Sequence, residues 1–237
     1  MAWVETPLAR DRAAIALADP QRRNYSYERM SEVEQRSRGE ATRADLLSAA
    51  RRLFAQRGFD GTSVRAITRE AGANLGAVTY HFGSKRALYA AVLEQGLRPI
   101  AQRVRAAAGS EGTAMERMLS VVEAYFEHFE VHPDLPHLLL QEVAAGKKPP
   151  QVVLEILRSA MEAIAGLQAA GTADGSVRAG DPVLTALSVV SQPVYLTLVA
   201  PLLKSVGPFD LTDPKTRKRA LEHTQAFVRG GLQPAKP

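Results

Sequence analysis

The sequence contains no cysteine among its 237 residues. Disulfide bonds, thiolate metal sites, iron–sulfur clusters and cysteine nucleophiles are therefore all excluded. The chain also lacks the GxSxG, P-loop and paired-carboxylate motifs that accompany common enzyme chemistries. We therefore expect neither an enzyme nor a bound cofactor, and a helical enzyme is the weakest of the functional hypotheses.

Long apolar runs are lacking as well. The most apolar stretch, residues 183–206, is interrupted by serine, glutamine, proline and threonine, whereas a membrane-spanning helix needs about 20 predominantly apolar residues. The N-terminal segment MAWVETPLARDR does not combine a basic segment with a following apolar one, as a signal peptide would. The sequence thus predicts a cytoplasmic protein with no membrane partner.

An excess of charge is confined to the N-terminal part. The net charge is +5, from 30 lysine and arginine residues against 25 aspartate and glutamate residues. Residues 1–86 hold fifteen basic and ten acidic side chains, whereas residues 87–237 hold fifteen of each. This asymmetry indicates a basic module joined to a neutral one, and it favours an anionic partner such as nucleic acid.

Helical periodicity follows residue 39, and no alternating pattern of useful length predicts a strand. Thr42 is placed to cap the first helix and Gly58 to end it, while Gly230-Gly231 is placed to end the last. The chain is predicted to be all-α with about nine helices. After the first helix we expect residues 64–71, 74–82, 85–108, 113–131, 135–145, 151–170, 182–205 and 213–229. Residues 1–39 are predicted to be a flexible arm, with at most a short helix around Arg10 to Ala18.

The segment from Thr62 to Lys85, TSVRAITREAGANLGAVTYHFGSK, has the length and the turn of a helix-turn-helix. Gly72 lies between the two short helices, where a positive φ is needed. One side of the segment is apolar, with Val64, Ile67, Ala71, Val78 and Phe82. The other side presents hydrogen-bond donors and positive charge, with Arg65, Arg69, Asn74, Thr79, Tyr80 and His81. In such a motif the second helix lies in the DNA major groove.

Over residues 42–93 the chain resembles the tetracycline repressor family of bacterial transcription regulators. The resemblance rests on LFAQRGFDGTSV, on the REAG turn and above all on YHFGSKRALYAAVL. It implies that the protein binds DNA as a homodimer through an N-terminal three-helix domain, residues 40–86. It also implies that a small molecule is sensed in a helical C-terminal domain, residues 87–237, which also dimerises.

The resemblance assigns roles to individual DNA-binding residues. Phosphate contacts are expected from Thr62 or Ser63, Asn74, Tyr80, His81 and Lys85. Base edges are expected to face Leu75, Gly76, Ala77 and Thr79. From chemistry alone, Thr62 and Ser63 stand at a helix N-terminus, which favours a phosphate, and Arg65 adds positive charge. Arg51, Arg52 and Arg69 are expected to be solvated or loosely attracted to phosphates.

Two further sets of residues in the C-terminal part are candidates for binding surfaces. An apolar pocket with a few polar groups is what a small molecule requires, and candidates to line one are Tyr125, Phe126, Phe129, Gln141, Gln192 and Tyr195, although most of them can equally be core residues. The helices over 182–205 and 213–229 carry more apolar residues than a monomer's surface needs. The candidate dimer-interface residues are Leu184, Leu187, Leu198, Leu202, Leu221, His223 and Phe227.

Histidine spacing leaves one alternative open. His128 and His132 stand four residues apart, a spacing that could place two metal ligands on one helix face. No HExxH motif is present and Pro133 follows directly, so a packing or surface role is preferred and no metal is expected.

The sequence therefore favours a ligand-responsive transcription regulator, a repressor, that binds a palindromic operator as a homodimer. The alternative is an architectural DNA-binding protein without an effector, for which a fully packed C-terminal domain is expected.

Overall fold

The computed structural model describes residues 20–146 and 148–234. Within these residues it contains nine α-helices and no strand, which confirms the all-α prediction. The helices are α2 (Pro20–Arg57), α3 (Val64–Glu70), α4 (Ala77–Phe82), α5 (Lys85–Ala108), α6 (Ala114–Val131), α7 (Leu135–Ala144), α8 (Gln151–Asp174), α9 (Pro182–Val206) and α10 (Pro214–Leu232).

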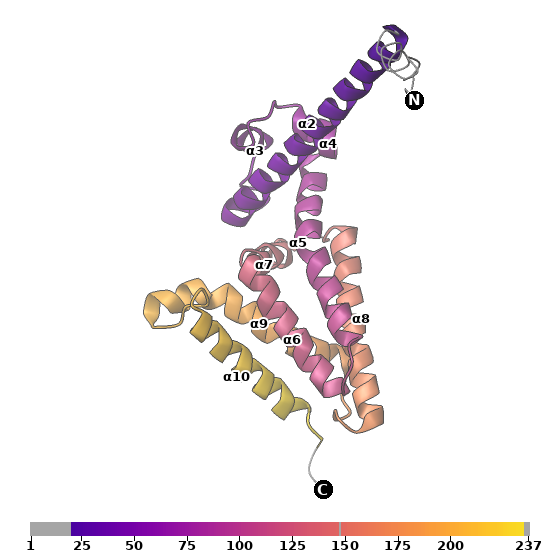
Figure 1. Ribbon diagram of the computed structural model, residues 1–237. Coiled ribbons are helices and arrows are strands. Elements are labelled where there is room, and N and C mark those ends of the chain that lie inside the picture. Colours follow the sequence, from indigo (N-terminus) through magenta and orange to yellow (C-terminus); the bar gives the residue numbers. More distant parts are fainter. Residues whose placement is uncertain (1–19, 147, 235–237) are drawn as a thin grey trace, which may run out of the picture.

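The molecule is elongated, and α5 runs between its two parts (Figure 1). The helices α2, α3 and α4 lie at one end, and α6 to α10 lie at the other. α5 packs against α2 and α4 with its first turns and against α6 and α8 further along. The two parts therefore share one continuous helix, which contains Pro99.

The first helix is much longer than predicted. α2 begins at Pro20, and Thr42 lies inside it, donating its hydroxyl to the Arg38 carbonyl at 2.9 Å. The predicted helix start at Thr42 is therefore wrong, and residues 20–39 are helical. The reason is that this stretch is rich in arginine, glutamate and glutamine, which have good helix propensity. The short helix expected around Arg10 to Ala18 lies outside the described residues.

A small core fixes α3 and α4 to α2 and α5. Phe54 of α2 and Tyr89 of α5 meet edge to face, with ring centroids 4.9 Å apart. Ile67 from α3 and Val78 from α4 are fully buried in the same core. This packing sets the angle between the two short helices.

Most helix ends in the C-terminal part lie close to the predicted positions, with two exceptions. Thr113 and Glu116 form a capping box at the start of α6, and Asp181 caps α9. α8 continues past the predicted end to Asp174 and stops at Gly175, whose φ is 78°. α10 continues through Gly230-Gly231 to Leu232, so these glycines do not end it. Burial of Leu232 offsets the cost of about 1 kcal/mol for each helical glycine.

A close contact between three helices surrounds His128. This side chain on α6 is 3% exposed, and its Nε2 donates to the Gly96 carbonyl of α5 at 2.9 Å. A Cβ on Gly96 would lie 2.7 Å from the Leu135 Cδ1 atom of α7, so a glycine is needed for this approach. The ring of His132 packs against His128, with centroids 4.7 Å apart. The two histidines thus have packing and hydrogen-bonding roles.

We expect stability to fall as the pH is lowered from 6.5 towards 4, because His128 stays neutral in the folded state. Burial lowers the pKa of His128 to about 4, although the Gly96 hydrogen bond opposes the shift. In this window the unfolded chain gains a proton that the native chain lacks. The free energy of unfolding then falls by up to about 1.4 kcal/mol per pH unit.

Urea unfolding across this pH range tests the prediction. His128→Gln is expected to flatten the dependence, although His132, whose pKa burial also lowers, adds to it with the same sign. His137→Gln, at an exposed position on α7, is the matched control and leaves the slope unchanged. An unaltered slope in His128→Gln would contradict the assignment.

Candidate DNA-binding interface

The turn between α3 and α4 is built as the motif requires. Ser63 caps α3, its Oγ accepting from the Ala66 amide at 3.1 Å. Gly72 has a φ of 64°, which only glycine adopts readily. The chain reverses there because the Ala73 amide donates to the Thr68 carbonyl at 2.9 Å. α3, the turn and α4 therefore form a helix-turn-helix whose outer side is open to solvent.

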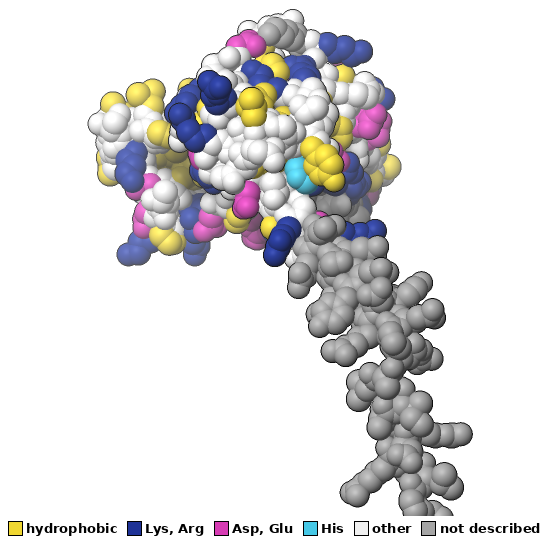
Figure 2. All heavy atoms as spheres, turned by 90° about the horizontal axis from the view of Figure 1, so that it is seen from above, with side chains coloured by type: hydrophobic (Ala, Val, Ile, Leu, Met, Phe, Trp, Pro, Cys, Tyr) yellow, Lys and Arg dark blue, Asp and Glu magenta, His cyan; other side chains and the backbone are white. Residues whose placement is uncertain are grey.

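Most of the predicted contact residues lie on this outer side. Exposed side chains come from both helices and from the turn, and His81 is half-buried. The exposed positions are Ser63, Arg65, Asn74, Leu75, Gly76, Thr79 and Tyr80. Tyr80 is 85% exposed and lies edge to face with the His81 ring, with centroids 4.9 Å apart. On the end of the molecule that carries this motif, lysine and arginine side chains lie scattered among uncharged ones (Figure 2).

Two predicted contact residues do not lie on this surface, which corrects the prediction for their side chains. Thr62 is buried, and its hydroxyl donates to the carbonyls of Leu53 and Gly58 at 3.1 and 2.8 Å. Ala77 is buried in the core beside Val78. Thr62 therefore joins α3 to the end of α2, and Ser63 is the residue of the pair that faces outwards.

Lys85 has a structural role that its sequence position did not indicate. Its Nζ donates to the carbonyls of Phe59 and Thr62, both at 2.8 Å, and lies 4.2 Å from the centre of the Phe59 ring. The ammonium thus uses two of its three hydrogen bonds to hold the loop that leads into α3. Only the third hydrogen bond of the ammonium is left for a DNA phosphate.

Three arginines on α2 also contact side chains of other segments. Arg43 stacks over the Phe82 ring of α4 at 4.9 Å. Arg52 pairs with Glu70 of α3 at 2.8 Å. Arg51 pairs with Asp134 at the start of α7. Arg52 is exposed, as expected, although it pairs with Glu70. Arg51 is only 20% exposed, so the expectation of a solvated side chain is wrong for it, and only its partner, which is distant in sequence, could have indicated this.

The six candidate ligand residues do not converge. Phe126 and Phe129 line a cavity of about 450 Å³ between α6, α9, α10 and the loop after α9. Tyr125 lies in the core, and Gln141 lies at the other end of the domain, with Nε2 3.5 Å from the Ala55 carbonyl. Gln192 and Tyr195 do not line the cavity. The other walls of the cavity include Thr197, Pro201, Leu211 and Arg217, which helical periodicity does not indicate.

The candidate dimer residues lie on α9 and α10, and five of the seven are exposed. Exposed positions on α9 and α10 are Leu184, Leu187, Leu202, His223 and Phe227, and half-buried ones are Leu198 and Leu221. Val183, Tyr195 and Val206 add further exposed apolar side chains to α9. The fold and this surface arrangement together define a helix-turn-helix DNA-binding protein with an apolar face at its far end.

Comparison with known families agrees with this class. Residues 46–92 match the family model "Bacterial regulatory proteins, tetR family". Residues 115–228 match the model "Tetracyclin repressor-like, C-terminal domain". The chain belongs to the tetracycline repressor family of transcription regulators.

Curated relatives include two bacterial regulators. The transcriptional repressor AcnR of Corynebacterium efficiens is 33% identical over 82 residues, which are 35% of this chain and 41% of AcnR. The chain thus spans less than half of AcnR. The transcriptional regulator RutR of Escherichia coli is 26% identical over 197 residues, which are 82% of this chain and 92% of RutR.

Solved structures share the fold along most of the chain. A tetR-family regulatory protein from Rhodococcus RHA1 has a TM-score of 0.69 at 21% identity, covering 82% of this chain and 98% of that one. The ketosteroid transcriptional regulator KstR2 of Mycobacterium tuberculosis has a TM-score of 0.66 at 22% identity, covering 81% and 95%.

Replacing Lys85 with methionine is expected to lower the free energy of unfolding by about 1–3 kcal/mol, since two partly buried carbonyls lose their donor. Chemical denaturation measures the change. Arg69→Met, at an exposed position on α3, is the matched control and should stay within about 0.5 kcal/mol of the parent. Equal stability of the two variants would show that Lys85 does not hold the loop.

Proposed function

We propose that the protein binds a palindromic operator as a homodimer and that a small molecule in its C-terminal domain changes this binding, with repression as the sense of regulation. Residues 40–86 form the DNA-binding domain, whose first helix begins earlier, at Pro20, and residues 87–237 form the domain for ligand and dimer. The observation that carries the proposal is the exposed polar and aromatic side of α3 and α4, where Tyr80 is 85% exposed.

Within this surface we distinguish the residues that position the protein on the DNA backbone from those that contact the bases. Ser63, Asn74, Tyr80 and His81 contact phosphates, while Leu75, Gly76 and Thr79 face base edges. Phosphate contacts set the register on the duplex and base contacts give sequence specificity. Support comes from the exposure of Asn74, Thr79 and Tyr80 around the start and outer side of α4.

A second copy of the chain is the partner we propose for the apolar face of α9 and α10. Leu184 and Leu202, which are 63% and 64% exposed, stand far apart along α9, and Phe227 extends the face onto α10. By length and composition α9 would also pass for a membrane-crossing helix. However, its other side packs against α6, α8 and α10, and the relatives are transcription regulators. We therefore place the protein in the cytoplasm.

A cavity in the C-terminal domain supports an effector over a purely architectural role. The 450 Å³ space beside Phe126 and Phe129 falls within the size range of small-molecule pockets. Its walls combine aromatic rings with Thr197 and the paired side chains of Arg217 and Glu130. A C-terminal domain that served only to dimerise would have no need for such a space.

Selection from random duplex DNA is expected to yield a palindrome whose half-sites lie about 34–36 Å apart or at a wider spacing. On that operator, Tyr80→Phe should weaken binding by about tenfold or less and equally for all sequences, because one neutral phosphate contact is lost. Thr79→Ala should instead change the preference at one or two base pairs by about 1–3 kcal/mol. Electrophoretic mobility shifts on operator variants measure both.

The control for the loss of a hydroxyl is Ser110→Ala, at an exposed position in the loop between α5 and α6 and outside both proposed interfaces, which should leave DNA affinity unchanged. If selection returns no consensus, sequence-specific regulation is wrong and the architectural alternative stands. If Tyr80→Phe alters base preference, the division between positioning and reading residues fails.

Leu202→Glu is expected to dissociate the dimer, because it places a charge in the proposed apolar interface. Sedimentation velocity at about micromolar concentration should show a dimer for the parent and a monomer for the variant. Val143→Glu on α7, where the parent valine is 76% exposed, is the matched control and should remain dimeric. A monomeric parent protein would refute the proposed assembly.

A further inference from the structure

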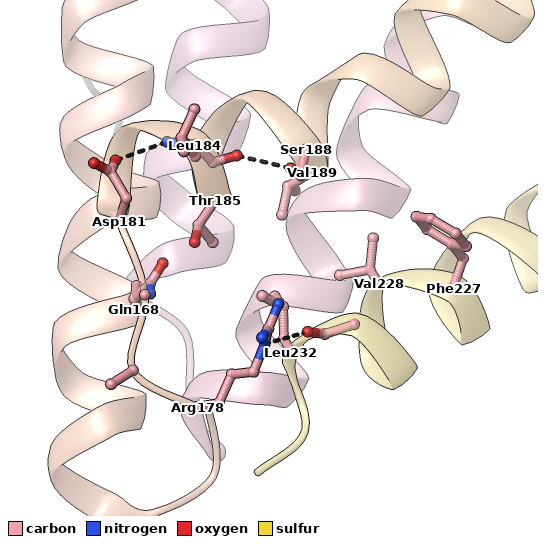
Figure 3. A pocket seen from close by; sticks show the side chains of 13 residues that line it. Gln168, Arg178, Asp181, Leu184, Thr185, Ser188, Val189, Phe227, Val228 and Leu232 are labelled. Carbon is pink, nitrogen blue, oxygen red and sulfur yellow. Dashed lines mark hydrogen bonds between the residues drawn. The ribbon is translucent and has the colours of Figure 1, made fainter. Parts of the chain in front are cut away.

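A second cavity, of about 370 Å³, lies beside the first turns of α9. The cavity at Phe126 and Phe129 lies near the other end of this helix. The walls of the second cavity come from the end of α8, the loop 175–181, the first turns of α9 and the last turns of α10 (Figure 3). Arg178 holds the loop in place. Its backbone amide donates to the Leu232 carbonyl at 2.8 Å, and its side-chain Nε donates to the Gly231 carbonyl at 2.6 Å. The cavity is therefore preformed.

One polar side chain in this cavity is buried without a partner. Gln168 on α8 is 3% exposed, and within the described residues neither Nε2 nor Oε1 of its amide makes a hydrogen bond. Buried amides are normally paired, because an unmade hydrogen bond costs folding free energy. Both halves of this amide are unpaired, and Figure 3 shows the side chain among the walls of the cavity, between Asp181 and Arg178.

The surrounding residues leave space for the amide. A Cβ on Gly180 would lie 2.9 Å from the Gln168 Nε2 atom and 3.8 Å from the Thr185 Oγ1 atom. A larger residue at position 180 would thus collide with the amide. Thr185 is itself buried and lines the cavity. Its hydroxyl is thus a second polar group in the same wall as the Gln168 amide.

The remaining walls are mainly apolar. Leu184, Val189, Phe227, Val228 and Leu232 form most of them, and Arg178, Asp181 and Ser188 add polar groups. An apolar space with a small number of placed polar groups favours a ligand with an apolar body and one polar end.

We propose that this cavity binds a small uncharged molecule with an apolar body and an amide or lactam head, which pairs with both atoms of the Gln168 amide. An amide presents a donor and an acceptor side by side, and its complement is a group with the same pair in reverse order. A carboxylate has only acceptors and would leave Oε1 of Gln168 unpaired. The site is distinct from the cavity at Phe126 and Phe129. Its walls Leu184 and Phe227 also belong to the proposed dimer interface, so a ligand bound here lies beside the second copy of the chain in the proposed dimer.

The first experiment uses isosteric probes on the full-length protein. Benzamide and δ-valerolactam carry the proposed head, acetophenone has only the acceptor, and benzoate has two acceptors and a charge. Ligand-observed NMR should show binding of the two amides with a Kd of about 1 mM or tighter, as befits fragments of this size. Acetophenone and benzoate should bind at least about tenfold more weakly, and Gln168→Met should weaken amide binding by about tenfold or more.

Three outcomes would overturn the proposal. Benzoate binding most tightly would show an anion site at Arg178. Amide binding that is unchanged in Gln168→Met would place the probes elsewhere. No binding of any probe at about 10 mM would show that the cavity takes no ligand of this class.

The second experiment needs no ligand. If the amide is unpaired, Gln168→Met keeps the shape of the side chain and removes an unmet hydrogen-bonding demand, so Tm should rise by about 2–8 °C. Gln102→Met, at an exposed position on α5, is the matched control and should leave Tm unchanged. A Tm of Gln168→Met that is unchanged or lowered would show that the amide is already satisfied, which also overturns the proposal.

Discussion

The relation between the two parts of the molecule depends on the ion pair between Arg51 and Asp134. Nε and Nη2 of Arg51 each lie 2.7 Å from an oxygen of Asp134, and Nη2 also lies 3.1 Å from the His132 Nδ1 atom. Burial would raise the pKa of Asp134, but the hydrogen bonds and charge of Arg51 hold it below its ordinary value. The planar guanidinium fixes direction as well as distance, so it orients α2 against the start of α7. The helix-turn-helix thereby has a defined orientation relative to the C-terminal helices.

The parts of the fold that were predictable from sequence are those set by neighbouring residues. α5 and α6 begin within one residue of the expected positions, because Ser84 and Thr113 cap their N-termini through contacts three residues away. The bounds of α2 and α10 differ from the predicted ones. A potential cap residue or a glycine sets the end of a helix only where the neighbouring residues do not favour a longer helix. Thr42 sits within a run of good helix formers, and Gly230-Gly231 is followed by Leu232, whose burial favours one more turn.

The candidate interface shows the same division between local and distant causes. Exposure of Thr79 and Tyr80 follows from helical periodicity, so it was accessible from sequence. Asn74 lies in the turn before α4, which begins at Ala77 and not at the predicted residue 74. The inward hydroxyl of Thr62 and the two carbonyl contacts of Lys85 depend on a loop whose path periodicity does not describe. Residues of the C-terminal cavities come from three or four segments each, and a single sequence does not show which segments meet.

The attachment of Lys85 to the loop before α3 makes the first turn of α5 part of the DNA-reading unit. α5 has 24 residues and so spans about 36 Å. If its far end were the fulcrum of a lever, a tilt of about 5° would displace the Lys85 end by about 3 Å. In a two-fold assembly the two displacements are opposed, so the spacing between reading helices would change by nearly twice as much. The displacement of one reading helix is close to the rise of one base pair, about 3.4 Å, and the change in spacing is close to two such rises. Small changes around the far end of α5 are therefore magnified to the scale of the DNA repeat.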